Sequence, residues 1–437
     1  MLKAHTGAVA RALARVTVDI APLRGSRDLR LLALGNFVTG LGTQAALLAL
    51  PYQLYVQTRS PVLTGLLGAV ELGPLVAMSL FGGALADRMD RRRLLLADQF
   101  ALVVISAALA AGAIAGHPPL LALYALGALL AGFGAVQNVA RSAIIPNLVE
   151  SAQLPGALAF SFGLYQLTMV VGPGLGGVLI ATWGLPTVYI VDAASCLAMA
   201  AAAGAIAPQP PHRVAGAHEA IGRAILQGLR FVRSKNALLG SFGIDLAAMT
   251  FGMPRALFPA LSLTVYHAGA AGTGALLAAV SAGATVAALS TGWLSHTRRL
   301  GRVVICAVAV WGVAIALAGA AGSLWAAMAL LALAGAADSV SAVCRSTINQ
   351  LLTPDAMRGR MSSVYSLVVT SGPRLGDIES GTVASLVSPR FSVVSGGVAC
   401  VLSVALFVRA FPALARFDSS LPQAPRPGSG GEPALAA

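Results

Sequence analysis

The chain has 437 residues, of which 57% are hydrophobic and 10% are charged, and its formal net charge is +13. A soluble domain has roughly 25% charged residues, because polar side chains must cover its core, so this composition excludes a soluble fold. It also argues against nucleic acid as a partner, since the sequence lacks the polar faces that such a partner needs. The positive charge instead indicates membrane topology and attraction to anionic lipid headgroups.

Twelve apolar stretches are long enough for a helix to cross the roughly 30 Å of hydrocarbon in a bilayer. The predicted spans are 31–56, 61–84, 94–116, 118–140, 155–181, 185–207, 236–264, 270–294, 303–321, 323–344, 361–387 and 391–412. The first 30 residues contain six basic residues and no apolar core with a cleavage site, so the first span is expected to act as the insertion signal.

The basic residues predict the orientation of these spans. With both termini and the loops after even-numbered spans on one side, 25 of the 29 Lys and Arg residues fall on that side. This count places Arg141 and Arg345 in loops, each directly after a span. Because positively charged loops stay in the cytoplasm, both termini are expected to be cytoplasmic, with the chain in a bacterial inner membrane.

The chain also repeats itself across a long central loop. Gly83-Ala84-Leu85, followed by three arginines, is echoed by Gly292-Trp293-Leu294, which is followed by further arginines. Internal repeats of this kind are common in transporters, so the predicted fold class is an all-α membrane protein with twelve transmembrane helices in two six-helix halves. The predicted organisation is a cytoplasmic segment 1–30, a six-helix bundle 31–207, an amphipathic cytoplasmic linker 208–235, a second six-helix bundle 236–412 and a disordered cytoplasmic tail 413–437.

The segment after the second span concentrates charge: in Gly83-Ala84-Leu85-Ala86-Asp87-Arg88-Met89-Asp90-Arg91-Arg92-Arg93, six of eleven residues are charged. It is similar to the signature Gly-x-Leu-Ala-Asp-Arg-x-Gly-Arg-Arg of the major facilitator superfamily, with Asp90 in place of the second glycine. That variant resembles the enterobactin-exporter-like branch of the superfamily, as do the stretches 244–246, 252–259, 358–361 and 371–377. The resemblance covers all twelve spans and leaves out the two tails.

The resemblance implies that the segment is a conformational latch on the cytoplasmic side, closed in the outward-open state. The latch motif comprises Gly83, Asp87, Arg88, Asp90, Arg91 and Arg92. A solvated loop that sets topology would explain the arginines, but not the two aspartates among them. Asp87 is expected to meet an arginine or the positive end of a neighbouring helix, and His296 takes its place in the second half.

Acidic residues within spans form a second set of candidates, because an ionised side chain costs roughly 2.5–3.5 kcal/mol at a helix centre. Asp98 and Asp338 are expected near an interface, and Asp192 in a contact between helices. The deeper residues are the proton-coupling candidates Glu71, Asp245, Asp377 and Glu379. The carboxyl groups of such residues can exchange protons near neutral pH.

The alternative for these acidic residues is a structural ion-pair network. Arg255 and Arg374 are the intramembrane counter-charges, and Arg374 lies three residues before Asp377 on the same helical face. Glu379 points elsewhere and needs another partner or a proton.

Other polar and small residues are assigned to a cavity and to a bent helix. The substrate-cavity candidates are Asn36, Gln44, Gln137, Asn138, Tyr165 and Gln166. The helix-bend motif is Gly172, Pro173, Gly176 and Gly177, which partly matches a motif of antiporters in the superfamily. Thr168 occupies the position where that motif has a further glycine.

The resemblance implies a proton-coupled, alternating-access exporter of an amphipathic small molecule, with a siderophore as substrate. A multidrug or macrolide-type efflux pump is the alternative. A membrane sensor or an intramembrane enzyme is disfavoured, because the chain has neither a soluble signalling domain nor a His-Glu-x-x-His or Gly-x-Ser-x-Gly motif. No cofactor and no metal site are expected, and the protein is predicted to act as a monomer.

Overall fold

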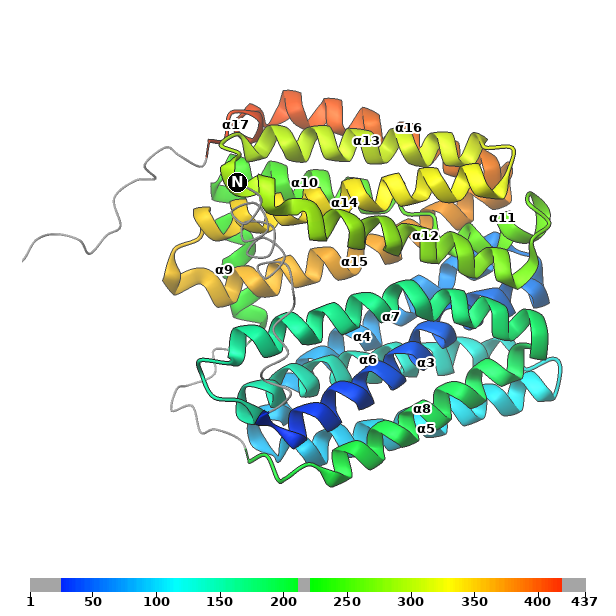
Figure 1. Ribbon diagram of the computed structural model, residues 1–437. Coiled ribbons are helices and arrows are strands. Elements are labelled where there is room, and N and C mark those ends of the chain that lie inside the picture. The colour runs from blue at the N-terminus through cyan, green and yellow to red at the C-terminus, as the bar shows by residue number, and fades with distance from the viewer. Residues whose placement is uncertain (1–24, 211–220, 419–437) are drawn as a thin grey trace, which may run out of the picture. The chain divides into compact units, whose positions relative to one another are not determined.

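The computed structural model describes residues 25–210 and 221–418, and expectations for the remaining residues lie outside this part of the chain. The described residues form helices and no strand (Figure 1). The long helices are α3 (Arg27–Thr58), α4 (Pro61–Arg88), α5 (Arg91–Ile114), α6 (Leu120–Leu148), α7 (Leu154–Trp183), α8 (Leu185–Ala205), α10 (Asn236–Phe251), α12 (Gly269–Ser290), α13 (Leu300–Ala320), α14 (Leu324–Leu352), α15 (Arg358–Leu386) and α16 (Pro389–Ala410). The shorter ones are α9 (Ile221–Ser234), η1 (Arg255–Leu257), α11 (Phe258–Thr264), η2 (Thr291–His296), η3 (Asp355–Met357) and α17 (Pro412–Ala415).

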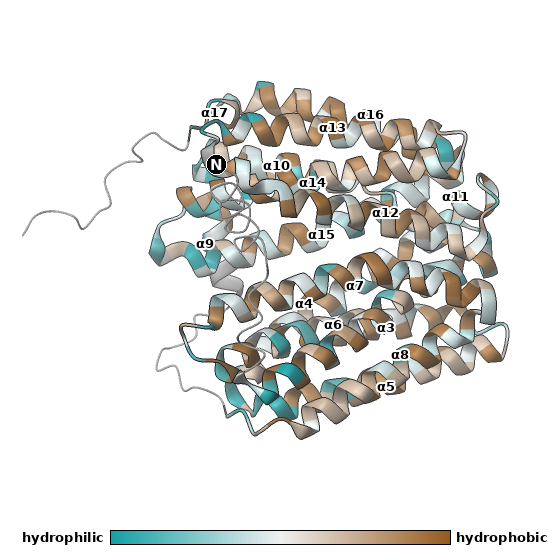
Figure 2. Ribbon diagram, viewed as in Figure 1, coloured by the Kyte–Doolittle hydropathy of each residue, from teal (hydrophilic) through white to brown (hydrophobic). Residues whose placement is uncertain are grey.

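Eleven helical segments in the described chain are long and apolar enough to cross a membrane. The remaining long helix, α15, is 29 residues long but more polar, because it carries three arginines and two acidic residues. Figure 2 shows hydrophobic residues along most of α13 and α16, whereas α9 is rich in hydrophilic residues. The predicted all-α membrane fold is confirmed, and α15 corresponds to the predicted span 361–387.

The described residues divide into two compact units. The first comprises 25–53 and 70–210, and the second comprises 54–69 and 221–418. In the first unit α5 packs along α8, and Figure 1 shows the two helices side by side. In the second unit α14 packs against both α12 and α13, and α13 packs against α16. Residues 54–69 group with the second unit, although the predicted boundary places them in the first bundle. The predicted bundle boundaries 31–207 and 236–412 stay a prediction.

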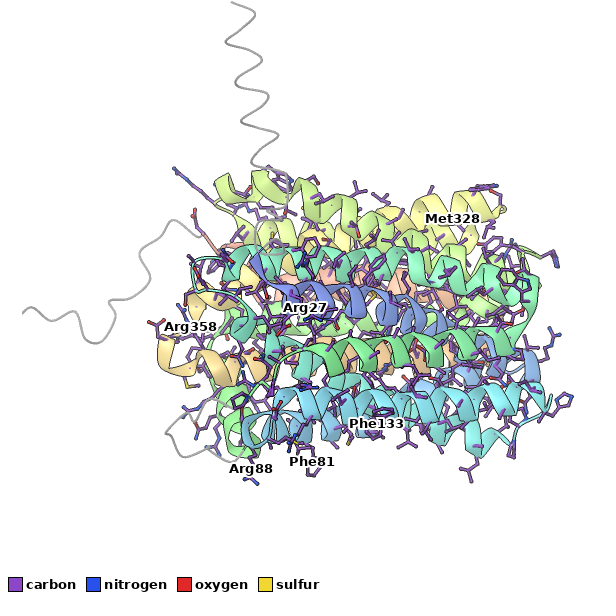
Figure 3. All side chains as sticks on the ribbon, turned by 60° about the horizontal axis from the view of Figure 1, so that its bottom comes forward. Arg27, Phe81, Arg88, Phe133, Met328 and Arg358 are labelled. Atoms are coloured by element: carbon purple, nitrogen blue, oxygen red, sulfur yellow. The ribbon has the colours of Figure 1, made fainter. Side chains whose placement is uncertain are left out.

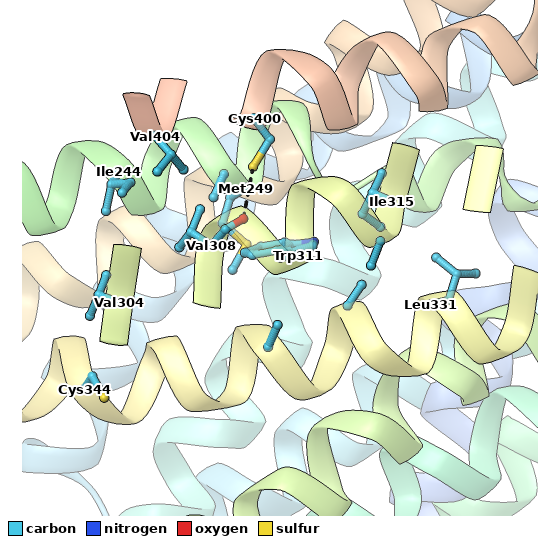
Figure 4. Close-up of a cluster of buried hydrophobic side chains, with 14 of the residues drawn as sticks. Ile244, Met249, Val304, Val308, Trp311, Ile315, Leu331, Cys344, Cys400 and Val404 are labelled. Carbon is cyan, nitrogen blue, oxygen red and sulfur yellow. Dashed lines mark hydrogen bonds between the residues drawn. The ribbon is translucent and has the colours of Figure 1, made fainter. Parts of the chain in front are cut away.

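The core of the second unit is built mainly from apolar side chains, some of which Figure 4 draws. Trp311 and Val308 of α13 lie beside Met249 of α10, and all three are buried. The Sγ of Cys400 on α16 lies 3.9 Å from the carbonyl oxygen of Val308, as the dashed line indicates. Backbones approach closely where side chains are small, as at Gly335 of α14, which lies directly against Val280 of α12.

Two helices extend further than their apolar runs indicated. Arg141 lies inside α6, which continues to Leu148, and Arg345 lies inside α14, which continues to Leu352. Their assignment to loops was wrong, because each side chain is held by polar partners on its helix or a neighbouring one and is thereby accommodated in the helical segment.

The predicted span 236–264 is interrupted. α10 ends at Phe251, and the chain passes through Gly252-Met253-Pro254 and η1 before α11 begins. Proline lacks the N–H group that continues a helix, and the interruption leaves backbone groups that need other partners. One is satisfied at once, because Trp311 Nε1 donates a 3.0 Å hydrogen bond to the carbonyl oxygen of Gly252.

Candidate functional site

A buried ion cluster joins α10 and α14 in the second unit. Arg345 Nη2 lies 2.8 Å from Asp245 Oδ1 and 3.7 Å from Asp338 Oδ1. Arg345 Nη1 also donates a 2.9 Å hydrogen bond to Ser341 Oγ. Arg345 and Asp245 are 3% and 2% exposed, whereas Asp338 is 27% exposed. The cluster therefore consists of the buried pair Arg345–Asp245 and the carboxylate of Asp338, which is partly exposed.

The cluster changes two expectations for these residues. The ion-pair partner of Asp245 is Arg345, which sequence reasoning had placed in a loop, and Asp338 belongs to the same cluster. The signal that could have revealed it is the spacing of Asp338, Ser341 and Arg345 on α14, which places all three on one helical face. Tyr365 of α15 interacts electrostatically with the cluster and packs edge-on against Phe242 of α10, with ring centroids 6.2 Å apart.

A second charged group lies at the interruption after α10. Asp377 of α15 is buried, and its Oδ1 accepts a 3.2 Å hydrogen bond from the backbone N–H of Ala256 in η1. Arg255 and Arg374 both interact electrostatically with Asp377, with Arg255 the stronger. Asp377 thus accepts a hydrogen bond from a backbone donor that the interruption of the helix released, and two arginines lie near its carboxylate.

The remaining proton-coupling candidates have less defined surroundings. Glu71 of α4 is 3% exposed in the first unit. Glu379 of α15 is half-buried, and its Oε2 has no hydrogen-bond partner among the described residues. Within the second unit, Asp245 and Asp377 each belong to a separate charged group.

The first unit contains a buried polar group that sequence reasoning treated only as a helix contact. Asp192 of α8 is fully buried. Its Oδ2 accepts a 2.6 Å hydrogen bond from Ser106 Oγ of α5, and its Oδ1 accepts a 3.3 Å bond from Thr43 Oγ1 of α3. The predicted contact between helices is confirmed, and it joins three helices rather than two.

Further polar side chains occupy the same seam between α3, α5 and α8. The Oγ1 of Thr39 lies 3.6 Å from the Sγ of Cys196, and Tyr189 donates a 2.8 Å hydrogen bond to Gln53 Oε1. Asp98 of α5 is also buried, at 2% exposure, and its Oδ2 accepts a 3.3 Å hydrogen bond from the side-chain amide of the adjacent Gln99. Its place near a membrane interface stays a prediction.

Two of the substrate-cavity candidates meet through an arginine. Arg141 Nη2 donates a 2.9 Å hydrogen bond to Asn138 Oδ1, and its guanidinium lies over the Tyr165 ring, 5.3 Å from the centroid. A cation positioned over an aromatic face is attracted by the ring quadrupole. Sequence reasoning missed this residue because it placed Arg141 outside the span.

The other cavity candidates lie on α3, α6 and α7. Asn36 lies on α3, and its buried Oδ1 has no hydrogen-bond partner among the described residues. Gln137 is half-buried on α6, and Gln166 lies on α7. Gln44 instead contributes to packing, because its Cβ lies directly against Gly172.

The glycine-proline motif of α7 forms a close-packing face. Gly172 and Gly176 lie directly against Gln44 and Ala45 of α3, where a side chain on either glycine would overlap its neighbour. Helix α7 continues through Pro173 and Gly177 to Trp183. Thr168 occupies the position where the motif has a further glycine, and it packs against Gly40 of α3. At this contact the glycine is therefore on α3 instead of α7.

The charged segment between α4 and α5 acts as a clamp on the helices around it. Asp90 is the N-cap of α5: its Oδ1 accepts hydrogen bonds from the backbone N–H groups of Arg92, at 2.8 Å, and Gln209, at 3.2 Å. The side chain of Arg92 donates to the carbonyl oxygens of Ala203, at 3.0 Å, and Gly204 at the end of α8. These contacts satisfy donors at the start of one helix and acceptors at the end of another.

The other residues of the latch motif occupy different surroundings. Arg91 Nη1 donates a 2.8 Å hydrogen bond to the carbonyl oxygen of Ala143 in α6. Asp87 and Arg88 are exposed near the end of α4, and Figure 3 shows the Arg88 and Phe81 side chains pointing away from that helix. The clamp therefore uses Asp90, Arg91 and Arg92, and the latch role of Asp87 stays a prediction. The side chain of His296 lies outside the described residues.

Among the described residues, no three His, Cys, Asp or Glu side chains are grouped so that they could hold a metal ion. The four cysteines are free thiols, three of them buried. The polar groups described above can bind protons, form ion pairs and hold neighbouring helices together. Such groups suit a protein that binds a ligand and changes conformation.

Comparisons with known proteins agree with this architecture. The family described as transmembrane secretion effector matches residues 17–428. The chain is 27% identical to the enterobactin exporter EntS of Shigella boydii over 407 residues, which is 93% of this chain and 97% of that protein. It is also 27% identical to the enterobactin exporter EntS of Citrobacter koseri over 406 residues, with the same coverage.

Solved structures share the fold at low sequence identity. A bacterial homolog of the human lysosomal transporter Spinster has a TM-score of 0.69 at 15% identity, covering 89% of this chain and 98% of that chain. A bacterial homologue of the iron transporter ferroportin has a TM-score of 0.68 at 15% identity, covering 89% and 99%.

Proposed function

Since the chain belongs to the transmembrane secretion effector family of the major facilitator superfamily, we propose that it exports a siderophore from the cytoplasm in exchange for protons. The chain is a multi-pass membrane transporter that acts on a small molecule, and it is not an enzyme. The observation that carries the proposal is the similarity to enterobactin exporters along 93% of the chain.

Alternating access provides the mechanism: two helical bundles rock around a binding site and open it to one side of the membrane at a time. The bundles are proposed to be residues 31–207 and 236–412. Asp87 of the latch motif stabilises the state that is closed toward the cytoplasm, while the Asp90 clamp holds α5 and the end of α8 together in both states.

The group around Arg141 contacts an aromatic or acidic substrate within this scheme. Asn138 and Tyr165 orient the guanidinium through a hydrogen bond and a cation–π contact. A guanidinium offers five N–H donors in a planar fork, which suits the closely spaced oxygen atoms of a siderophore.

Location and orientation follow from the distribution of charge. The protein is proposed to reside in the bacterial inner membrane as a monomer with both termini in the cytoplasm, because 25 of 29 basic residues were assigned to that side. Arg141 and Arg345 lie in helices rather than in loops, but most of the other basic residues still fall on the side assigned to the cytoplasm. Fluorescent and periplasmic reporter fusions at the C-terminus test it, and a periplasmic C-terminus would refute it.

Secretion by intact cells tests the function. The gene is expressed in a strain that makes enterobactin but lacks its exporter, and enterobactin is measured in the medium and in the cells. Expression is expected to restore secretion, whereas a matched strain carrying the empty vector retains the siderophore. Unchanged siderophore secretion combined with increased tolerance to hydrophobic drugs or macrolides would favour the efflux-pump alternative.

A further inference from the structure

We propose that Asp192 is a proton-binding carboxyl group of this transporter, seated in the seam of α3, α5 and α8. The inference rests on the proposed proton-coupled export and assigns it to a residue outside the four acidic candidates that the sequence suggested.

Asp192 has no cationic partner within its seam. Basic residues occur in α3 only at Arg27 and Arg30 and in α5 only at 91–93, all at the starts of these helices, whereas α7 and α8 contain none. Asp192 lies seven positions into α8, or about 10 Å along its axis, and Ser106 lies about 22 Å along α5. A carboxylate that is fully buried without a cation is neutralised most readily by a proton.

The partners of Asp192 suit both protonation states. Ser106 and Thr43 contribute hydroxyl groups, and a hydroxyl can donate to a carboxylate or accept from a carboxylic acid after rotating its hydrogen. When Asp192 is protonated and donates to Thr43, the threonine can turn its own hydrogen to the backbone one turn earlier on α3. The site therefore keeps its hydrogen bonds while gaining or losing a proton.

Two other buried acidic residues, Asp245 and Asp377, have partners that favour only one protonation state. Asp245 faces the guanidinium of Arg345 at 2.8 Å, and Asp377 accepts from a backbone N–H near two arginines. Guanidinium and backbone N–H groups can only donate, so these contacts stabilise a carboxylate and offer no acceptor for the proton of a carboxylic acid. These two residues are accordingly assigned to structure, and the proton to Asp192.

The titratable groups around the site are few. Tyr189 and Cys196, on the same helix, interact electrostatically with Asp192, and Asp98 of α5 interacts with Cys196. The remaining titratable side chains of the packed helices are Asp28 at the start of α3, Tyr52 and Tyr55 near its end, and Tyr165 of α7. Asp98 is the matched comparison, because its Oδ2 accepts a hydrogen bond from the neighbouring Gln99 on its own helix.

The two carboxyl groups differ in what their protonation can change. The bonds of Asp192 reach α3 and α5 from α8, so the loss or gain of its proton alters contacts among three helices. The bond of Asp98 stays within α5. Protonation of Asp192 can therefore bias a rearrangement of the unit, which proton coupling requires.

The test compares Asp192→Asn with Asp98→Asn in proteoliposomes, using iron-free enterobactin as the probe. Asparagine can accept from Ser106 and donate to Thr43, so it imitates the protonated form. Asp192→Asn is expected to lose transport driven by a pH gradient by at least about tenfold while downhill exchange changes less than about twofold. Asp98→Asn is expected to retain both.

A second readout detects the proton itself. Infrared difference spectra between acidic and alkaline pH are expected to contain the carbonyl band of a protonated carboxyl group in the native protein and in Asp98→Asn, and to lack it in Asp192→Asn. Ser106→Ala removes one donor to the carboxylate, so the pH of half-maximal transport is expected to rise by about one unit.

The outcomes separate the two proposals. If the native protein moves enterobactin but ignores the pH gradient, proton-coupled export fails whatever Asp192 does. If the native protein responds and Asp192→Asn responds equally, or Ser106→Ala leaves the pH profile unchanged, the assignment to Asp192 is overturned. Should Asp192→Asn not fold, as judged by size-exclusion chromatography, Ser106→Ala and the infrared spectra of the native protein still decide the matter.

Discussion

Replacing Arg345 with methionine tests the buried cluster most directly. The substitution keeps a long side chain and removes the charge that lies 2.8 Å from Asp245 and 3.7 Å from Asp338. Removing one partner of a buried ion pair costs about 3–5 kcal/mol, because the other charge remains without compensation. The partial exposure of Asp338, at 27%, lets one of the two carboxylates be solvated, so we expect the lower end, about 3 kcal/mol.

The assay is thermal unfolding of the purified protein in detergent. For a folding unit of about 150–250 residues, 1 kcal/mol lowers Tm by about 2–4 °C, so Arg345→Met should lower Tm by about 6–12 °C. Asp245→Asn should cost less, about 1–2 kcal/mol, because Asp338 still faces the guanidinium. The double variant should be more stable than Arg345→Met, since neutralising Asp245 removes the buried charge that the arginine had compensated.

Two results would refute this reasoning. An unchanged Tm for Arg345→Met would mean that the pair contributes nothing beyond the packing that methionine retains. Equal Tm values for Arg345→Met and the double variant would mean that the two side chains are not coupled, despite the 2.8 Å contact.

The charged segment after α4 supports two further predictions. Asp87→Asn should leave expression and folding unchanged while strongly reducing transport in proteoliposomes, with Asp355→Asn, at an exposed site, as the neutral control; transport at the native rate would exclude a latch at Asp87. Asp90→Ala should cost about 1 kcal/mol of stability, because it removes the N-cap of α5, whereas Asp90→Asn should retain the cap. Equal unfolding temperatures for the two Asp90 variants would show that the cap contributes nothing to stability.

Much of the fold could be predicted because the bilayer imposes a simple rule on sequence. Each crossing segment needs about 20 apolar residues, and charged loops separate such segments, so helices like α13 and α16 are visible as uninterrupted apolar runs. The rule failed where a charged residue was buried. Arg141 and Arg345 ended the apolar runs in sequence, yet α6 and α14 continue past them because polar partners hold both side chains.

The candidate site was less predictable, since partners come from helices far apart in the chain. Arg374 and Arg255 were expected to neutralise the acidic residues, and both do act on Asp377. The partner of Asp245, however, is Arg345, one hundred positions away, and no spacing rule connects α10 with α14. The substitution of Asp90 for glycine could be read as a family variant, but its role as a cap that also holds Gln209 required the structure.

The sequence by itself determined that this protein is a helical membrane protein with two related halves, because hydropathy and the distribution of arginine act locally along the chain. Only the tertiary structure decided which buried charges are neutralised by arginine and which is not. That distinction depends on a few ångströms between helices: Asp245 lies 2.8 Å from a guanidinium, whereas Asp192 lies 2.6 Å from a hydroxyl group that can serve it with or without a proton.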